Sequence, residues 1–364
     1  MPPATDLLPC PFVAGPKITD LRLFVGRREP LQDLASRMNA VQPMSVNLVG
    51  ERRIGKSSLL YTFAQVWDRY IPPEMRRRAY VVAYLDLQEI RPRSTGDFYR
   101  AILNVLRQRP LWSQFPQLQQ MLQACPPEQV AFGEFLEACQ AHSLLPVICL
   151  DEFEALFDAP QAFDDDFFDV QRGYMNASKL MYVIATHRTL DFYRKQHRLT
   201  SSFFNLGHVL ELGEFSEDEA ADLVRLPAST VPGAPAALGL AEQRLARQWG
   251  GRHPFLLQLA GYFLCQARQR GKGASWAEER FRAEARRLPA RRTPRQLLKR
   301  TLRLLWNLPL HLGRLARGLQ ENADDLKDRL SGIAILLLIL LVLLGVLGKD
   351  ILRAWIGTLL EIKP

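Results

Sequence analysis

The segment from Gly50 to Ser57 has the residue types and the spacing of a phosphate-binding loop. It reads GERRIGKS, which fits the P-loop pattern of a glycine, four variable residues, a second glycine, a lysine, and a serine or threonine. In such a loop the backbone N–H groups and the start of a helix point at an anion. Lys56 would contact the β- and γ-phosphates, and the Ser57 hydroxyl would bind Mg²⁺. The residues expected to hold the nucleotide in this loop are Gly50, Arg53, Ile54, Gly55, Lys56, Ser57 and Ser58.

The flanks of the loop supply the elements that must position it. Residues 44–49 form a short apolar run that predicts a buried strand, and residues 58–63 begin a helical pattern. The alternative is a surface loop that is simply rich in glycine and arginine, and such a loop needs neither flank. The sequence therefore predicts a site for ATP or ADP with Mg²⁺.

Two acidic residues follow a second buried strand. The apolar run 146–150 leads directly into Asp151 and Glu152. ATP hydrolysis at a P-loop requires a group that holds the metal and a group that orients the attacking water. We assign the first role to Asp151, acting through water, and the second to Glu152. The alternative is that both acids only begin the next helix, where negative charge is favourable.

A third apolar run, residues 181–185, is followed by Thr186, His187 and Arg188. Open α/β sheets bind ligands at the carboxyl ends of their strands. We expect Thr186 to hydrogen-bond the γ-phosphate or the water, and Arg188 to contact the γ-phosphate with its planar guanidinium. His187 is interpreted as a loop residue.

Four segments together resemble a known family. Residues 10–16 (CPFVAGP), 24–29 (FVGRRE) and 50–60 resemble the bacterial STAND-type ATPases, relatives of the AAA+ proteins. Residues 250–258 (GGRHPFLLQ) resemble the Gly-Gly-x-Pro stretch in the helical lid of those proteins. The likeness extends from about residue 9 to about residue 270.

The resemblance implies further roles. Val25 and Gly26 would pack near the adenine, the segment from Thr186 to Arg188 would sense the γ-phosphate, and the segment ending at Pro254 would close over the nucleotide. Many STAND proteins have two aspartates where this chain has Asp151 and Glu152, which implies hydrolysis closer to that of AAA+ enzymes. STAND proteins usually carry a repeat-based sensor, but the sequence shows no repeat with a period of 20 to 50 residues. We therefore expect an unknown partner protein to act as sensor or trigger.

A long apolar segment lies near the carboxyl end. Residues 333–347 contain no charged or strongly polar side chain, and with their flanks they come close to the roughly 20 residues that cross a bilayer. We predict a transmembrane helix at 331–348 and a short tail, 349–364, on the far side of the membrane.

The net charge of the protein comes from one segment. Residues 286–318 hold ten Lys and Arg residues and no acid, so subtracting ten from the formal net charge of +9 leaves the rest of the chain at −1. The positive-inside rule places this segment and the ATPase in the cytoplasm. Residues 286–330 are predicted to form a basic amphipathic linker that binds an anionic membrane surface. Nucleic acid is the competing partner of this segment, because clustered arginine also suits it.

Length and composition favour several domains. The chain of 364 residues exceeds the usual single-domain size. We predict an amino-terminal arm (1–23), an α/β P-loop NTPase domain (24–215) with a parallel five-stranded sheet, and an all-α lid (216–285). The expected strands are residues 44–49, 80–85, 146–150, 181–185 and 208–212. The five cysteines form no C-x-x-C pair, so we expect no zinc site and a reducing cytosol.

These features together predict a membrane-anchored ATPase whose nucleotide state controls homo-oligomerisation, with a role in bacterial defence or stress signalling. Two alternatives remain. The first is a motor or assembly ATPase of a membrane complex. The second is a DNA-binding ATPase of the origin-recognition type, because residues 151–154 also resemble those proteins.

Overall fold

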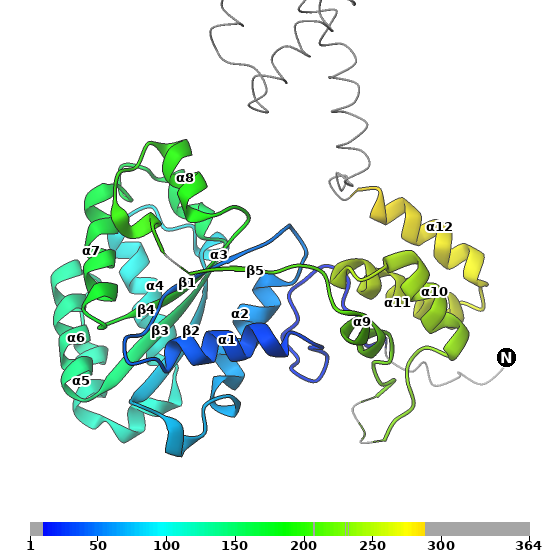
Figure 1. Cartoon of the computed structure of the whole chain (residues 1–364), viewed down its shortest axis with the longest axis horizontal. Coiled ribbons are helices and arrows are strands. Elements are labelled where there is room, and N and C mark those ends of the chain that lie inside the picture. The colour runs from blue at the N-terminus through cyan, green and yellow to red at the C-terminus, as the bar shows by residue number, and fades with distance from the viewer. Residues whose placement is uncertain (1–9, 207, 230, 232, 288–364) are drawn as a thin grey trace, which may run out of the picture. The chain divides into compact units, whose positions relative to one another are not determined.

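Five apolar runs of the chain pair as a parallel sheet. The computed structural model describes residues 10–206, 208–229, 231 and 233–287 (Figure 1). The strands lie in the order β2-β3-β4-β1-β5, and every pair is parallel. Their bounds are β1 Val46–Val49, β2 Ala79–Asp86, β3 Leu144–Asp151, β4 Met181–Thr186 and β5 Val209–Glu211. The predicted five-stranded α/β fold is confirmed, with small shifts at the strand ends.

Both faces of the sheet are covered. Every residue of β3 is buried, and successive side chains of a strand point to opposite faces. Val147 and Cys149 therefore belong to one hydrophobic core, while Ile148 and Leu150 belong to the other. Helices α1 and α2 contribute to the first core and α4, α6 and α7 to the second. Burial on both sides explains why the strands read as continuous apolar runs.

The helices alternate with the strands in the first part of the chain and then follow one another. The α-helices are α1 Arg28–Met38, α2 Lys56–Val66, α3 Leu87–Ile90, α4 Thr95–Arg107, α5 Pro116–Ala124, α6 Gln129–Ala141, α7 Asp165–Asn176, α8 Leu190–His197, α9 Glu217–Val224, α10 Leu240–Gly250, α11 Pro254–Gln269 and α12 Ala274–Ala285. Short 3-10 helices are η1 Trp67–Arg69, η2 Pro73–Met75, η3 Pro110–Gln114, η4 Phe153–Asp158 and η5 Ser202–Phe204.

The strand order brings three loops to one edge of the sheet. β4 pairs with β3 on one side and with β1 on the other. Because all strands are parallel, the segments after β1, β3 and β4 leave from the same edge. These segments are the P-loop, the acidic pair and the residues that follow Thr186.

Helices α9 to α12 form a helical bundle whose starts are set by the sequence. A capping box begins α9, because the Ser216 hydroxyl accepts from Glu219 N and the Glu219 carboxylate accepts from Ser216 N. Between α10 and α11, a Cβ at Gly250 would lie 2.8 Å from Leu257 N, so only glycine fits there. His253 caps α11, and Pro254 occupies its first turn, where a missing N–H costs nothing.

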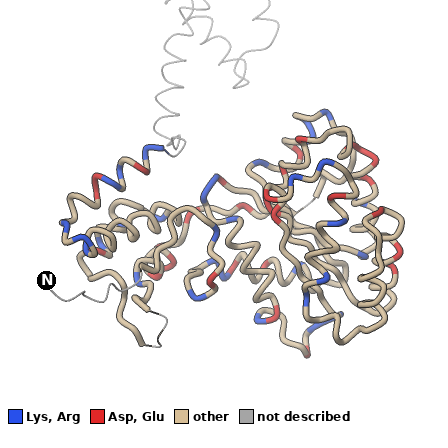
Figure 2. Tube along the Cα trace, turned by 180° about the vertical axis from the view of Figure 1, so that it is seen from behind, with Lys and Arg blue, Asp and Glu red and all other residues tan. Residues whose placement is uncertain are grey.

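Basic and acidic side chains are interspersed along the described chain (Figure 2). Among the described residues, no helix is both long enough and apolar enough to cross a membrane. The predicted transmembrane helix (331–348), the predicted tail (349–364) and all but two residues of the predicted linker (286–330) lie outside the described residues.

Candidate nucleotide-binding site

The P-loop turns between β1 and α2 in a conformation that needs its glycines. Gly55 has φ 101° and precedes the first residue of α2, a backbone region that side chains disfavour. A Cβ at Gly50 would lie 2.8 Å from Leu212 O and 2.9 Å from a methyl of Ile54. The first glycine is therefore required by close packing and the second by its dihedral angle.

Lys56 folds back over its own loop. The side chain is nearly buried, with 7% exposed. Its Nζ donates to Gly50 O at 2.7 Å and to Glu51 O at 3.1 Å, and it lies 3.0 Å from His187 Nδ1. Burial lowers the pKa of Lys56, and the carboxylate of Glu152 partly opposes that shift. The ammonium thus lies at the start of α2, where a P-loop lysine contacts phosphates.

Asp151 and Ser57 form the pair expected to hold Mg²⁺. Asp151 is the last residue of β3 and only 1% exposed. Its carboxylate accepts from Tyr84 Oη at 2.7 Å and from the Ser57 hydroxyl. Burial raises its pKa, and these two hydrogen bonds oppose that change. A carboxylate and a hydroxyl in contact are oxygen donors of the kind that Mg²⁺ prefers beside phosphate oxygens, so the residues fit this ion.

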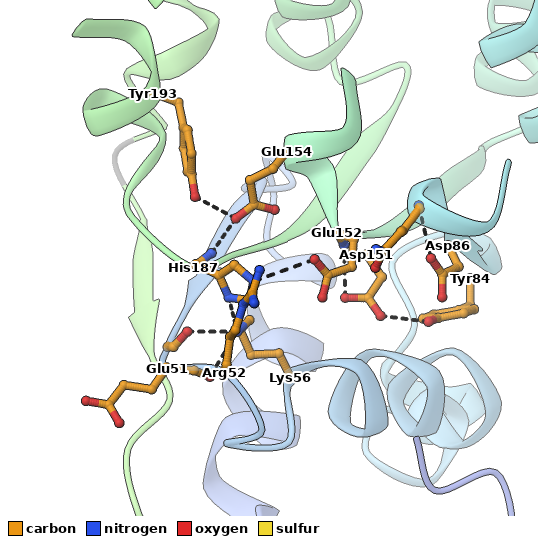
Figure 3. Close-up of polar contacts among 12 residues, drawn as sticks. Glu51, Arg52, Lys56, Tyr84, Asp86, Asp151, Glu152, Glu154, His187 and Tyr193 are labelled. Atoms are coloured by element: carbon orange, nitrogen blue, oxygen red, sulfur yellow. Dashed lines mark hydrogen bonds and ion pairs between the residues drawn. The ribbon is translucent and has the colours of Figure 1, made fainter. Parts of the chain in front are cut away.

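Glu152 faces the P-loop across His187. Its backbone has φ 49° and it directly precedes η4, whereas Asp151 ends β3, so only one of the two acids stands at the start of the next helical segment. Glu152 Oε2 lies 3.6 Å from His187 Nε2. Burial, followed by the Asp151 charge, raises the pKa of Glu152. Figure 3 shows the Glu152 carboxylate, the His187 ring and the Lys56 ammonium facing one another.

His187 is the residue that sequence reasoning missed. It follows β4 as expected, but its ring contacts Lys56 on one side and Glu152 on the other. Its backbone N donates to Glu154 Oε1 at 2.6 Å, which also accepts from Tyr193 Oη at 2.7 Å. Burial and then the nearby Lys56 charge lower the pKa of His187. The available signal was its place directly after the third apolar run, because open α/β sheets bind ligands at the carboxyl ends of their strands.

Thr186 and Arg188 differ in their surroundings. Thr186 is 1% exposed, and its hydroxyl accepts from Asn47 Nδ2 at 2.7 Å, which leaves the hydroxyl proton available for donation. Asn47 comes from β1, so the P-loop strand holds Thr186 in place. The Arg188 guanidinium lies 5.8 Å from the centre of the Phe192 ring. The contacts of both residues with the γ-phosphate remain predictions.

Val25 and Gly26 line a pocket of about 840 Å³ between the core and the helical bundle. Gly26 has φ 72°, and a Cβ there would lie 2.7 Å from Glu219 Oε1. Beside it, the buried Arg27 donates to Ile54 O at 3.1 Å and to Gly213 O at 2.7 Å. The segment expected near the adenine is thereby joined to the P-loop. Among the described residues, the pocket lining includes neither the P-loop nor Pro254.

The start of α11 reaches the P-loop. The Arg53 guanidinium lies 4.3 Å from the centre of the Phe255 ring, in the range of a cation–π contact. Phe255 follows Pro254, so Pro254 lies one residue from a direct contact with the loop. The residues expected to bind phosphate, to bind the metal and to orient water thus lie close together. Helix α11 contacts the P-loop, which carries the first of these groups.

A family model described as Novel STAND NTPase 1 matches residues 17–272. No curated protein matches the sequence. Among solved structures, a Walker-type ATPase of Pyrococcus abyssi is similar with a TM-score of 0.53 and 16% identity over 89% of this chain and 93% of that chain. The ORC2 protein of Aeropyrum pernix, in its ADPNP and ADP complexes, is similar with a TM-score of 0.53 and 13% identity over 96% of this chain and 81% of that chain. At these identities the two structures show a shared fold alone.

Proposed function

Because the chain belongs to the Novel STAND NTPase 1 family, we propose that it binds and slowly hydrolyses ATP with Mg²⁺ and that its nucleotide state controls self-association. The observation that carries the proposal is the convergence of Lys56, Ser57, Asp151 and Glu152. Lys56 and Ser57 begin α2, and Asp151 and Glu152 lie at the end of β3. The two pairs meet through Asp151–Ser57 and through the His187 ring.

Each residue has a distinct task in the proposed reaction. Lys56 places a positive charge against the phosphates, and Ser57 with Asp151 provides oxygen ligands. Mg²⁺, when bound, supplies the charge that neutralises the phosphates. Glu152 polarises the attacking water, and its raised pKa makes it a stronger base than an exposed glutamate.

Two contacts between the nucleotide-binding core and the helical bundle support a switch. Arg53 touches Phe255 of α11, and the N–H of Arg27 donates to Glu219 of α9. A ligand shifts a conformational equilibrium only through interactions that differ between the two states. We assign that difference to a γ-phosphate contact with Thr186 or Arg188, so that ADP favours a closed lid and ATP an open form that oligomerises.

The membrane setting of this proposal is supported by the sequence. An apolar segment at 331–348 follows a basic segment at 286–330, which suits a single membrane crossing with the ATPase in the cytoplasm. Oligomerisation would then gather several membrane helices. A role in bacterial defence or stress signalling follows from the family resemblance, with an unknown protein as the trigger.

Two substitutions test the site directly. Lys56→Ala should abolish or greatly weaken nucleotide binding, because the buried ammonium is lost. Glu152→Gln should retain binding and lose hydrolysis, because the amide is not a base. Steady-state turnover and equilibrium binding of ATP, measured on detergent-purified full-length protein, separate the two effects. Glu128→Gln, at an exposed position, is the matched control and should resemble the wild type.

The same measurement decides between the switch and its alternatives. Turnover that is orders of magnitude below the enzyme median of about ten per second, with retained nucleotide, supports a switch. Turnover near that median would favour a motor or assembly ATPase. If Lys56→Ala binds ATP with wild-type affinity, the assignment of the nucleotide-binding site is wrong. Duplex DNA binding that weakens steeply with salt and that survives removal of residues 286–364 would favour the DNA-binding alternative.

A further inference from the structure

The amino-terminal arm lies along one stripe of α11. The Phe12 ring packs directly over Gly261, where a side chain on the helix would collide with it. The next residue, Val13, donates its N–H to Gln258 Oε1 at 2.9 Å. The arm therefore runs antiparallel to α11, with earlier arm residues beside later helix residues.

This register places two cysteines together. Residues 258, 261 and 265 share one face of a helix. In the arm, Cys10 lies two residues before Phe12. The thiols of Cys10 and Cys265 are in hydrogen-bond contact. Cys10 is partly exposed, whereas Cys265 is 4% exposed. Arg268 Nη2 lies 3.8 Å from Cys265 Sγ, which places a positive charge beside the pair.

The surroundings give the two sulfur atoms different reactivity. The hydrogen bond from Cys265, helped by the Phe12 backbone and the Arg268 charge, lowers the pKa of Cys10 although burial opposes the shift. The same hydrogen bond raises the pKa of Cys265. Burial raises the pKa of Cys139 to about 12, so that thiol is unreactive. Thiolates are the nucleophiles in thiol chemistry, and Cys10 is therefore the attacking residue.

The other end of the arm is fastened to the nucleotide site. Ile18 N donates to the Ser58 hydroxyl at 3.0 Å, at the start of α2. Lys17 Nζ donates to Tyr84 Oη at 3.2 Å and forms an ion pair with Asp86 at 3.5 Å. Tyr84 in turn donates to Asp151. The short arm thus connects α11 with the P-loop helix and with the predicted metal ligand.

We propose that Cys10 and Cys265 form a reversible disulfide that fastens α11 to the nucleotide-binding core through the arm and slows nucleotide release. The consequence for nucleotide release rests on the proposed function, whereas the bond itself does not. A peroxide serves as oxidant. The Cys10 thiolate attacks one oxygen of hydrogen peroxide and breaks the O–O bond, which leaves sulfenic acid and hydroxide. The Cys265 sulfur then displaces the hydroxyl, so that two thiols and one peroxide give one disulfide and two waters.

A cytosolic disulfide of this kind is transient and senses redox state. A dithiol such as dithiothreitol, or the cellular glutathione pool, restores both thiols by exchange. Reduction then frees α11 from its covalent link to the arm.

The bond is tested by peptide mapping of the folded full-length protein. After brief exposure to hydrogen peroxide, the remaining thiols are alkylated, the protein is digested, and the peptides are identified by mass spectrometry. We expect a linked peptide pair containing Cys10 and Cys265 in the wild type and in Cys125→Ser, and none in Cys10→Ser or Cys265→Ser. Recovery of both cysteines alkylated, or of Cys10 oxidised without a link, would overturn the disulfide.

The effect on the lid is tested by the release of a fluorescent ADP analogue, N-methylanthraniloyl-ADP, during a chase with unlabelled ADP. Peroxide should slow release several-fold in the wild type and in Cys125→Ser, and dithiothreitol should reverse the change. Release from Cys10→Ser should not respond. A linked peptide with unchanged release would refute the fastening of α11. A reduced protein that binds no ADP would refute the proposed function, while the peptide map would still decide the disulfide.

Discussion

At the scale of single residues, the His187 ring connects the two halves of the candidate site. Nδ1 lies 3.0 Å from Lys56 Nζ, and Nε2 lies 3.6 Å from Glu152 Oε2. Arg52 Nε also donates to Nε2 at 3.3 Å, so both nitrogens of the ring have polar neighbours. We therefore predict that His187 positions Lys56 and Glu152.

Replacing His187 tests this positioning. His187→Ala should lower kcat about ten- to hundredfold, since small misplacements of catalytic groups cost this much. The affinity for ADP should change far less, because the P-loop backbone is intact. Single-turnover hydrolysis and equilibrium ADP binding measure the two quantities, and His142→Ala, at an exposed position, is the control. Equal losses in binding and turnover would contradict a positioning role.

The lowered pKa of His187 also predicts a pH dependence of stability. The ordinary histidine value is 6.5, and the folded value is lower because of burial and the Lys56 charge. As pH falls below the ordinary value, the unfolded chain takes up a proton before the folded protein does, so the free energy of unfolding decreases until the folded pKa is passed.

Glu152 has a raised pKa, so its contribution to the free energy of unfolding increases as pH falls, opposite to that of His187. Comparing the pH dependence of stability in wild type and in His187→Asn isolates the contribution of His187. The melting temperature of wild type should fall more steeply than that of the variant between about pH 7.5 and about pH 5.5. If the melting temperatures of the two proteins change equally with pH, His187 has the same pKa in the folded and unfolded states, and the prediction is wrong.

At the scale of elements, Glu219 joins the start of α9 to the segment before α1. Its carboxylate accepts from Ser216 N at 2.8 Å and from Arg27 N. Gly26 makes this approach possible, because a Cβ there would lie 2.7 Å from Glu219 Oε1. The positive φ of Gly26 adds strain for any other residue.

Gly26→Ala should therefore destabilise the protein by about 2 kcal/mol, the usual cost of overpacking a tight contact, and should weaken nucleotide binding by moving α9. Gly173→Ala is the matched control, because no atom lies within 4 Å of its Cβ position in α7. That change should be neutral or should stabilise by about 1 kcal/mol, the helix preference for alanine. Thermal unfolding with and without ADP measures both variants, and a similar loss in the two would refute the role of Gly26.

At the scale of the whole molecule, charge and hydropathy are unevenly distributed along the chain. The ten positive charges of residues 286–318 outweigh the net charge of the remainder. The apolar run 333–347 follows them closely. The proposed membrane attachment would use both as signals, the apolar run for insertion and the basic segment for electrostatic attraction.

Deleting residues 331–364 separates these signals. We expect the truncated protein to float with vesicles that contain anionic lipid at low salt and to leave them at high salt, because screening weakens electrostatic attraction. The full-length protein should stay with membranes in both conditions. If high salt extracts the full-length protein from membranes, the predicted membrane crossing is wrong. If the truncated protein floats with neutral vesicles, its membrane binding does not depend on electrostatic attraction.

The sequence alone determined the fold class and the main site candidates. The strand before the P-loop and the strand that leads into Asp151 were both predicted from neighbouring residues. Burial on both faces makes a parallel strand a continuous apolar run, and a phosphate loop needs fixed glycines at fixed spacing. These constraints act over a few consecutive positions, so the sequence displays them.

Only the tertiary structure decided which distant side chains share the site. The contact of Tyr84 with Asp151 depends on the pairing of β2 with β3, and that of Asn47 with Thr186 depends on the pairing of β1 with β4. The bridge made by His187, and the meeting of Cys10 with Cys265, likewise join residues that are far apart in the chain. Strand order and helix packing set these contacts through the whole core, and no local pattern of residues encodes them.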